Sequence, residues 1–270
     1  MNEKAYRSAE GISRSELWKL RESPEKFKWH RENPQPPSSA LIFGRAVHKL
    51  LLEPETFDDE FAIMPKFDKR TKDGKIAEES FREVLSDRDI ITNVDYKIAS
   101  EMAEKARKNP FVQELLVGEY EKPLFWKDDL TGELCKVRLD ILTNYNGELT
   151  VVDYKTTTNA ETHKFNRSIY NYGYHFQAGM YCEAVKQTLK TGEFPNFVFI
   201  AQEKTPPYPI NIIAVPEDVI LHGYDVFREL IGIYHECKET GYWYGYNGAF
   251  NLPNEAYLLG WVKHEADFEE

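Results

Sequence analysis

The chain has 270 residues, 41% of them hydrophobic, and a formal net charge of −11 at pH 7. This length and composition suit one large domain with a hydrophobic core. No run of about 18 apolar residues occurs, which excludes a transmembrane helix, and the polar N-terminus lacks the apolar segment of a signal peptide.

The first elements expected along the chain are helical. Residues 13–30 have the pattern of two short helices. Residues 32–37 contain three prolines, which cannot continue a helix and therefore indicate a linker. Ser38 or Ser39 then provides an N-cap for a helix that runs to about Glu53, directly before a proline.

A polar stretch follows over residues 65–90, with few periodic apolar positions. Residues 66–75 (KFDKRTKDGK) predict a mobile, solvated loop, and their basic character leaves a DNA-contacting loop as the alternative. Thr92 and Asp95 resemble a capping box, and apolar residues with helical spacing follow them. A helix is therefore predicted over residues 94–108.

The rest of the chain alternates strands and helices. Helices are expected over 170–190 and 216–239, and strands over 120–127, 134–143, 148–155, 195–202 and 208–214. This order implies an α/β fold, a three-layer core with a mixed central sheet flanked by helices.

Two of these strands are joined by Asn146-Gly147. Asn-Gly between two β-rich runs is the strongest short-range signal for a hairpin, because a type I′ turn needs positive φ at both central residues. Counting back from the turn places Asp140 opposite Asp153. Residues two apart on a strand project to the same face, so Lys155 is expected to join the two acids in one patch.

Like charges that face each other across two strands destabilise a sheet unless a cation lies between them. Asp140 and Asp153 could hold Mg²⁺ or Mn²⁺, since both metals prefer oxygen ligands. Alternatively, this is a solvated strand face on which Arg138 and Lys155 neutralise the acids. Asp153 directly follows an apolar run and so is expected at a strand end, which favours the metal site.

An Asp followed about a dozen residues later by Asp-x-Lys resembles the core motif of the PD-(D/E)xK nucleases. Three further segments resemble, in family order, the RecE-type (exodeoxyribonuclease VIII) branch, which is related to lambda exonuclease and the AddB nuclease domain. They are SRSELWKLRESPEKFKWHREN at 13–33, GRAVH at 44–48, and YHFQ at 174–177 with Tyr181. The resemblance spans roughly residues 10–245.

The resemblance implies a restriction-endonuclease-like fold in a single nuclease domain over residues 1–270. Its expected parts are N-terminal helices over 10–60, a catalytic core over 90–215, and a C-terminal helix and tail over 216–270. Some relatives carry an iron–sulfur cluster on four cysteines. The three widely spaced cysteines here argue against a cluster and fit a reduced, cytoplasmic protein.

By resemblance the protein is a metal-dependent exonuclease that digests duplex DNA from 5′ to 3′ in phage or prophage recombination. Its expected partners are double-stranded DNA and a single-strand annealing protein of the RecT type, and a homo-oligomer is consistent with the family. Two alternatives stay open: a catalytically silent nuclease-fold protein that binds DNA or a partner, and an endonuclease with the same centre.

The net charge of −11 is unexpected for a DNA-binding protein. However, residues 1–50 carry ten Lys and Arg against six Asp and Glu, whereas residues 203–270 carry four against twelve. Binding depends on the field near the phosphates rather than on the total charge, so the net charge does not exclude a nuclease.

The resemblance also implies roles for the residues of the hairpin. Asp140 and Asp153 are expected to be metal ligands and catalytic residues, with the carbonyl of Tyr154 completing the coordination. Lys155 is expected to orient or deprotonate the attacking water and to offset charge in the transition state. His48 matches a metal ligand, although a lone His on an apolar helix is more often a core residue. Gly44, one turn earlier, is expected to leave open space above its imidazole.

The remaining candidates are expected to bind DNA or to support the site. Gln177 and Tyr181 are four residues apart and so share a helix face; a polar pair that faces the core is the alternative. Of Thr156 and Thr157, one is expected to contact a phosphate, with completion of the strand as the alternative; Thr156 and Arg138 are placed in the supporting group. Glu121 matches an acidic position of the family, but the sequence assigns it no role.

Overall fold

A computed structural model describes residues 3–68 and 70–248 of the chain. The strands are β1 (Ile12–Ser13), β2 (Phe61–Met64), β3 (Asp89–Thr92), β4 (Gly118–Lys127), β5 (Leu134–Tyr145), β6 (Glu148–Thr157), β7 (Asn196–Glu203) and β8 (Ile210–Val215). The α-helices are α1 (Glu3–Ser8), α2 (Arg14–Leu20), α3 (Pro24–Glu32), α4 (Ser39–Leu52), α5 (Phe57–Glu60), α6 (Lys72–Val84), α7 (Asn93–Lys108), α8 (Pro110–Leu115), α9 (Thr162–Asn171), α10 (Tyr174–Leu189) and α11 (Glu217–Thr240), and a 3₁₀ turn covers Pro54–Thr56. In the described part of the chain, no helix has the length and apolar character needed to cross a membrane.

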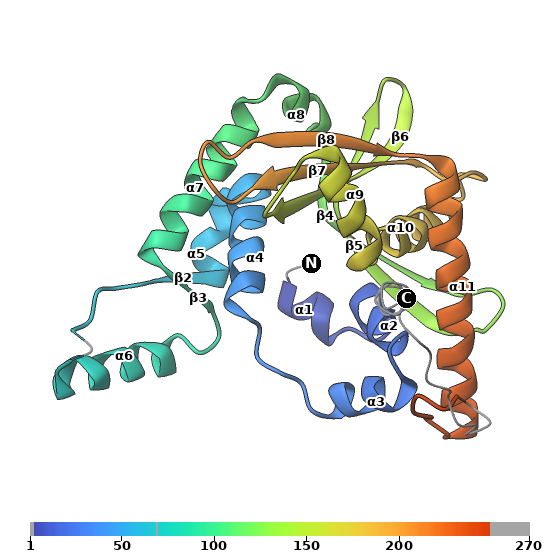
Figure 1. Cartoon of the computed structure of the whole chain (residues 1–270), viewed down its shortest axis with the longest axis horizontal. Coiled ribbons are helices and arrows are strands. Elements are labelled where there is room, and N and C mark those ends of the chain that lie inside the picture. The colour runs from blue at the N-terminus through green and yellow to red at the C-terminus, as the bar shows by residue number, and fades with distance from the viewer. Residues whose placement is uncertain (1–2, 69, 249–270) are drawn as a thin grey trace, which may run out of the picture.

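The centre of the molecule is a six-stranded mixed sheet in the order β1-β5-β6-β7-β8, with β4 paired to β5 (Figure 1). β6 and β7 are parallel, whereas β5–β6 and β7–β8 are antiparallel. One hydrophobic core joins the sheet to α2, α10 and α11, and a second joins it to α4, α7 and α8. The predicted three-layer α/β arrangement is confirmed.

The predicted hairpin turn is present. Asn146 has φ 53° and Gly147 has φ 88°, the positive values that a type I′ turn requires. Tyr145 pairs with Glu148, as counting from the turn predicts, and four further antiparallel pairs keep the same register.

The ladder between β5 and β6 stops at the pair Ile141–Val152, one pair short of the predicted one. The pairing of Asp140 with Asp153 therefore does not form, because the two strands separate at this point. One edge of β5 is paired with β4 along nearly the whole length of β4. The strand β1, which pairs with Lys136, must therefore lie on the other edge of β5, where β6 no longer pairs. This separation leaves a gap in the sheet.

Two of the predicted helix starts are confirmed. The Ser38 hydroxyl accepts a hydrogen bond from Leu41 N–H (3.3 Å) at the start of α4. The Thr92 hydroxyl accepts one from Asp95 N–H (3.0 Å) at the start of α7. In both cases a side-chain oxygen satisfies a backbone donor that has no partner inside the helix.

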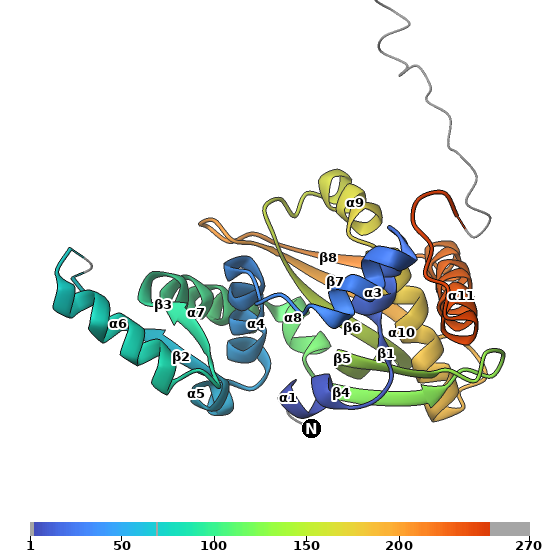
Figure 2. The same ribbon diagram turned by 90° about the horizontal axis from the view of Figure 1, so that it is seen from below.

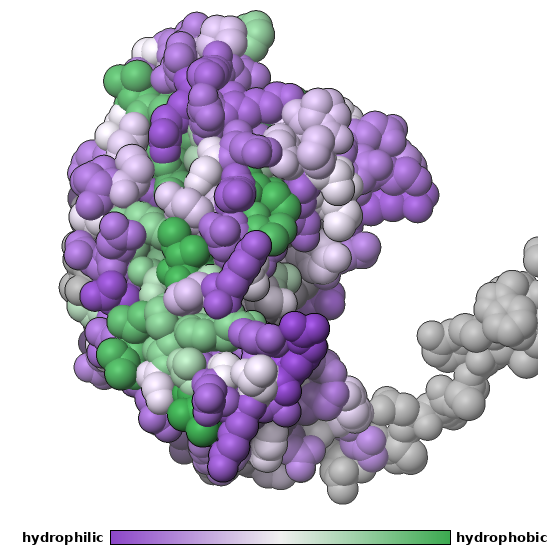
Figure 3. All heavy atoms as spheres, turned by 90° about the vertical axis from the view of Figure 1, so that its left-hand side faces the viewer, coloured by the Kyte–Doolittle hydropathy of each residue, from purple (hydrophilic) through white to green (hydrophobic). Residues whose placement is uncertain are grey.

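Residues 66–75 do not form a single loop as predicted, because residues 72–84 fold into α6. Together with the parallel pair β2–β3, this helix forms an arm that projects from the core in both ribbon views (Figure 2). Figure 3 views this side and shows apolar side chains in scattered groups among polar ones. Ile76 and Val84 on α6 and Val94 on α7 are among the exposed ones. The sequence did not predict the arm, because this segment has few apolar residues and polar residues flank them.

The predicted helix over residues 170–190 corresponds to α10, which begins four residues later than predicted because the unpredicted helix α9 ends just before it. Gly173, with φ 67°, separates them, and its α-carbon lies so close to the Trp18 ring that an added Cβ would approach the ring to 2.5 Å. Any residue with a side chain would therefore clash here as well as adopt a strained backbone. The short helix α1 and strand β1 were also not predicted.

Candidate active site

The gap between β5 and β6 places polar groups at the edge of the sheet. Residues 137–140 of β5 have no strand partner on this edge. The N–H of Tyr154, which has lost its partner on β5, donates instead to Asp140 Oδ2 (2.9 Å). The separation of the strands thus turns the Asp140 carboxylate toward β6 and holds it there.

Three side chains converge beside this gap, from three different elements. His48 comes from α4, Glu121 from β4 and Asp140 from β5, and one ligand atom of each lies within 4.8 Å of the others. His48 Nδ1 is 3.4 Å from Asp140 Oδ2. Within the described residues this is the only such group of three or more His, Cys, Asp and Glu side chains.

Glu121 reaches this group through an unusual backbone conformation. It has φ 48° in the middle of β4, a left-handed conformation that a non-glycine residue rarely adopts in a strand. It occupies the position across from Asp140 in the β4–β5 register, where the ladder skips one pair. Strained residues of this kind concentrate at functional sites, where the surrounding structure holds them.

Asp153 lies deeper, with 1% of its surface exposed. The Gln177 amide donates to its Oδ1, and the Lys155 ammonium forms an ion pair with its Oδ2. Lys155 also lies over the Tyr174 ring, 4.9 Å from its centre. The acid, the lysine and α10 are therefore joined on the face of β6 that looks toward α10.

Arg138 connects the group of His48, Glu121 and Asp140 to the N-terminal helix. Its Nε lies 2.8 Å from Glu121 Oε2, and its Nη2 pairs with Glu3 of α1. Lys136 donates to backbone carbonyls at the end of α1, including that of Arg7 (3.1 Å). In Figure 1, α1 lies between α4 on one side and α2 and α3 on the other.

Burial dominates the acid–base properties of the group. Burial, helped by the nearby Asp140 charge, raises the pKa of Glu121 to about 8. Burial also raises the pKa of Asp140 and, against the opposing effect of Lys155, raises the pKa of Asp153 to about 6. For His48, burial and the Lys155 charge lower the pKa to about 4, so its imidazole is neutral near pH 7.

These side chains fit a divalent cation. The neutral imidazole can donate a lone pair, and two carboxylates supply the hard oxygen ligands that Mg²⁺ and Mn²⁺ prefer. Glu121 Oε2 and Asp153 Oδ2 are buried and accept no hydrogen bond from the described residues, although each lies against a cation. The negative charges of these carboxylates are poorly compensated. Poor compensation raises the pKa of a buried carboxyl group and also favours the binding of a cation.

The site opens into two hollows. The first, about 580 Å³ in volume, is walled by α1, α2 and α3, and basic side chains outnumber acidic ones along it. We call it the basic groove. The second, about 600 Å³, lies toward α4 and the β2–β3 arm and carries more acids than bases. Both hollows contact Arg138, Asp140 and Lys155.

The predicted site residues lie close to where the sequence placed them. His48, Asp140 and Lys155 all line the second hollow, as does Thr156, and Gly44 leaves the expected open space: an added Cβ would contact only the Thr156 hydroxyl, at 3.7 Å. Their roles stay predictions.

The residues predicted to support the site occupy distinct positions. Gln177 and Tyr181 line the basic groove from α10. The Tyr154 ring is fully buried on the opposite face of β6, where its hydroxyl donates to Gln202, and it meets the His48 ring edge-on at 5.2 Å. The predicted ligand role of the Tyr154 carbonyl stays a prediction.

Sequence reasoning did not assign Glu121 to the metal group and did not find Glu3. The signal for Glu121 was its position across from Asp140, but the six-residue connection between β4 and β5 gave no turn from which that register could be counted. Glu3 is far from the motif in sequence, and only the packing of α1 brings it to Arg138.

Comparisons with known proteins agree with this arrangement. The family model described as "PDDEXK-like domain of unknown function (DUF3799)" matches residues 13–255. A crystal structure described as "Putative exonuclease" from Eubacterium rectale is similar over 98% of this chain and 98% of its own, with a TM-score of 0.64 and 16% sequence identity. The structure of SSO0001 covers 86% of this chain and 81% of its own at a TM-score of 0.37 and 13% identity, too low to support an argument. No curated protein matches the sequence.

Proposed function

The chain belongs to the DUF3799 family of PDDEXK-like domains, and from that premise we propose that it is a divalent-metal-dependent DNA exonuclease. The observation that carries the proposal is the gap between β5 and β6. There the Asp-x-Lys motif of β6 meets a neutral histidine and two carboxylates from other elements.

We assign the metal to His48, Glu121 and Asp140, with Asp153 and the carbonyl of Tyr154 as further ligands by resemblance. A bound Mg²⁺ or Mn²⁺ would neutralise phosphoryl oxygens and lower the pKa of a coordinated water. Glu121 extends the ligand set that the sequence suggested, and its place beside Asp140 supports the addition.

Lys155 is assigned to the reacting atoms. Its ammonium, held between Asp153 and the Tyr174 ring, offsets negative charge that develops on the phosphate. Gln177 acts as a positioning residue, because its amide fixes one oxygen of Asp153 and leaves the other to Lys155. Arg138 orients Glu121 and provides a second cation near the phosphate.

The finer features follow from the resemblance to RecE-type nucleases. They are a duplex DNA substrate, 5′ to 3′ polarity, a role in phage or prophage recombination, a RecT-type annealing partner and a homo-oligomeric state. The basic groove supports a nucleic-acid substrate, because its charge is locally positive although the net charge of the chain is −11.

A digestion assay tests the proposal. Linear duplexes labelled at the 5′ or the 3′ end and a covalently closed circle are incubated with Mg²⁺, with Mn²⁺ or with a chelator. We expect release of the 5′ label as short product, an intact circle, and no digestion with chelator or with the Asp140→Asn variant.

Each alternative gives a different result. Cleavage of the closed circle would identify an endonuclease with the same centre. Binding of the duplex without cleavage in either metal would identify a silent nuclease-fold protein and would contradict the proposal. Early release of the 3′ label would retain the nuclease but reverse the polarity.

A further inference from the structure

The basic groove leads away from the catalytic carboxylates toward α3. Asp140 and Asp153 line it, and so do His30 and Arg31 of α3. Its volume of about 580 Å³ lies in the range of small-ligand pockets rather than that of a cleft for a double helix. A groove of this size suits one strand of nucleic acid.

Cations along the groove are available to an anionic ligand. The Arg14 guanidinium donates to the carbonyls of Tyr172 (2.5 Å) and Gly173 (2.8 Å) and forms no ion pair with any described carboxylate. Lys19 is exposed and forms no ion pair with any described residue. These two side chains lie on α2 and line the same groove as Asp140, Asp153 and the α3 residues.

An exposed aromatic ring continues the path beyond the groove. Trp29 on α3 is 51% exposed, and its ring meets the His30 ring edge-on at 5.1 Å. It also lines a small hollow with the exposed Lys28 and with two acids, Glu25 and Glu32. A half-exposed indole at the end of a groove in which cations outnumber acids can bind an unpaired base by stacking while the cations of the groove hold the backbone.

The helix α3, which carries Trp29, is rigid because it is fixed to the segment after α11. Phe27 is buried and stacks on Trp243, with ring centres 5.4 Å apart, and the Glu25 N–H donates to the Tyr244 carbonyl (3.0 Å). A ring on a rigid helix loses little entropy on binding a base.

We propose that α2 and α3 form a binding track for single-stranded nucleic acid, in which Arg14 and Lys19 hold phosphates and Trp29 stacks on a base. The single strand would be continuous with the strand at the active site. This last connection rests on the proposed function, whereas binding to the track does not. An unpaired strand is required, because paired bases do not offer their faces to a side chain.

The track is tested without cleavage. A fluorescein-labelled single-stranded oligonucleotide of about 15 nucleotides is titrated with the full-length protein in chelator, and anisotropy and tryptophan fluorescence are recorded. Trp29→Ala should weaken binding by about ten- to a hundredfold. Trp29→Phe should retain most of the affinity but lose most of the fluorescence quenching. Lys19→Ala should lower the slope of log affinity against log salt by about 0.7.

Phe111→Ala provides the matched control. Phe111 is 64% exposed on α8 and lines a different, apolar hollow, so its loss should leave binding unchanged. If Trp29→Ala impairs folding, Trp29→Phe provides the test. If the oligonucleotide quenches the tryptophan fluorescence of Trp29→Phe as much as that of the unaltered protein, the stacking assignment is wrong.

Two other results would also overturn the proposal. Unchanged affinity in a folded Trp29→Ala variant would show that the ring takes no part. Equal competition by a blunt duplex would show that the surface binds phosphates of either form. Cleavage assays test the proposed function separately. If the protein binds single strands through Trp29 but does not cleave DNA, the nuclease assignment is wrong. If it cleaves normally but does not bind in this way, only the binding track is wrong.

Discussion

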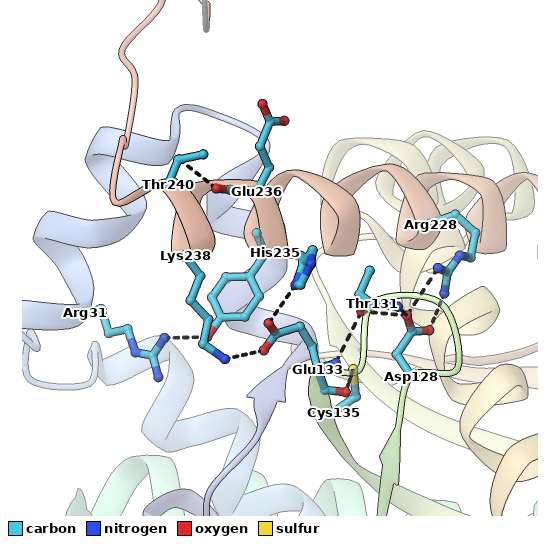
Figure 4. A network of polar contacts seen from close by, with 11 residues as sticks. Arg31, Asp128, Thr131, Glu133, Cys135, Arg228, His235, Glu236, Lys238 and Thr240 are labelled. Atoms are coloured by element: carbon cyan, nitrogen blue, oxygen red, sulfur yellow. Dashed lines mark hydrogen bonds and ion pairs between the residues drawn. The ribbon is translucent and has the colours of Figure 1, made fainter.

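Two regions of the described structure hold closely packed carboxylates, and the regions differ in how completely the charges are compensated. One is the gap between β5 and β6. The other is the junction between the β4–β5 loop and α11, shown in Figure 4. There Asp128 accepts hydrogen bonds from Thr131 and forms a two-pronged ion pair with Arg228. Glu133 accepts from His235 (3.0 Å) and Lys238 (2.7 Å) in the same way.

The pKa shifts of the two regions have opposite signs. Burial would raise the pKa of Asp128 and Glu133, but their cationic and hydrogen-bonding partners more than offset it and lower both. In the gap, burial outweighs the partners and raises the pKa of Glu121, Asp140 and Asp153. Complete pairing fixes a loop to a helix, whereas incomplete pairing leaves carboxylates that favour an added cation.

The largest expected difference between the regions comes from removing one acid in each. Asp140→Asn should lower the cleavage rate by at least about a thousandfold, because a ligand is lost. The free energy of unfolding without metal should hold or rise, since burial disfavours the Asp140 charge. Asp128→Asn should keep the rate and lose about 1–3 kcal/mol of stability, because it leaves Arg228 without its partner.

Nuclease assays and denaturant unfolding in chelator measure both effects. The comparison fails if Asp140→Asn destabilises the metal-free protein as much as Asp128→Asn does. Asp153→Asn should behave like Asp140→Asn in the nuclease assay, and more than a few per cent of residual activity in both variants would exclude the two-acid site.

The next largest difference is expected from removing one cation in each region. Lys155→Ala should slow the single-turnover rate by at least about a hundredfold, with DNA affinity changing far less, because its charge is needed where charge develops. Arg228→Ala should leave the rate intact and lower the melting temperature. If Lys155→Ala cleaves at a normal rate but binds DNA weakly, Lys155 is a phosphate clamp and its assignment is wrong.

A smaller effect is expected from His48→Ala. If His48 is a ligand, the Mg²⁺ concentration needed for half-maximal activity should rise by about tenfold or more, with little change in thermal stability. Isothermal titration with Mn²⁺ gives the same comparison without turnover. A buried structural histidine would show the reverse, with lower stability and an unchanged metal titration.

The smallest effect is the pH dependence of stability in chelator. The pKa of Glu121 rises from its ordinary value of 4.5 to about 8 on folding, so the folded state keeps a proton that the unfolded chain releases. The stability that this gives is present below pH 4.5 and is lost as pH rises toward 8. Glu121→Gln should remove this loss, which melting temperatures across the range will show.

Mg²⁺ should reduce the loss in the unaltered protein, because it binds the ionised carboxylate. The α11 junction should respond in the opposite direction: the lowered pKa values of Asp128 and Glu133 make its contribution disappear at acid pH. A melting temperature that rises steadily from pH 4.5 to 8 in chelator would contradict the assignment for Glu121.

Local patterns in the sequence predicted much of the fold. The Asn146-Gly147 turn determined the hairpin register, because turn geometry is decided by the residues of the turn itself. Ser38 and Thr92 marked two helix starts for the same reason. The arm around α6 was missed, because its helix is mostly polar and buries none of its residues, so the few apolar residues that share one face were too sparse to predict a helix.

Taken alone, the sequence determined which residues of the hairpin would meet, since a strand and a tight turn relate neighbours in the chain by simple counting. It did not determine that the strands separate one pair before Asp140, because that depends on β1 taking the same edge of β5. Glu121 joins Asp140 only through a left-handed backbone residue in β4, and Glu3 only through the packing of α1. These contacts join segments distant in sequence, and the whole fold, rather than local preference, provides the energy that holds them.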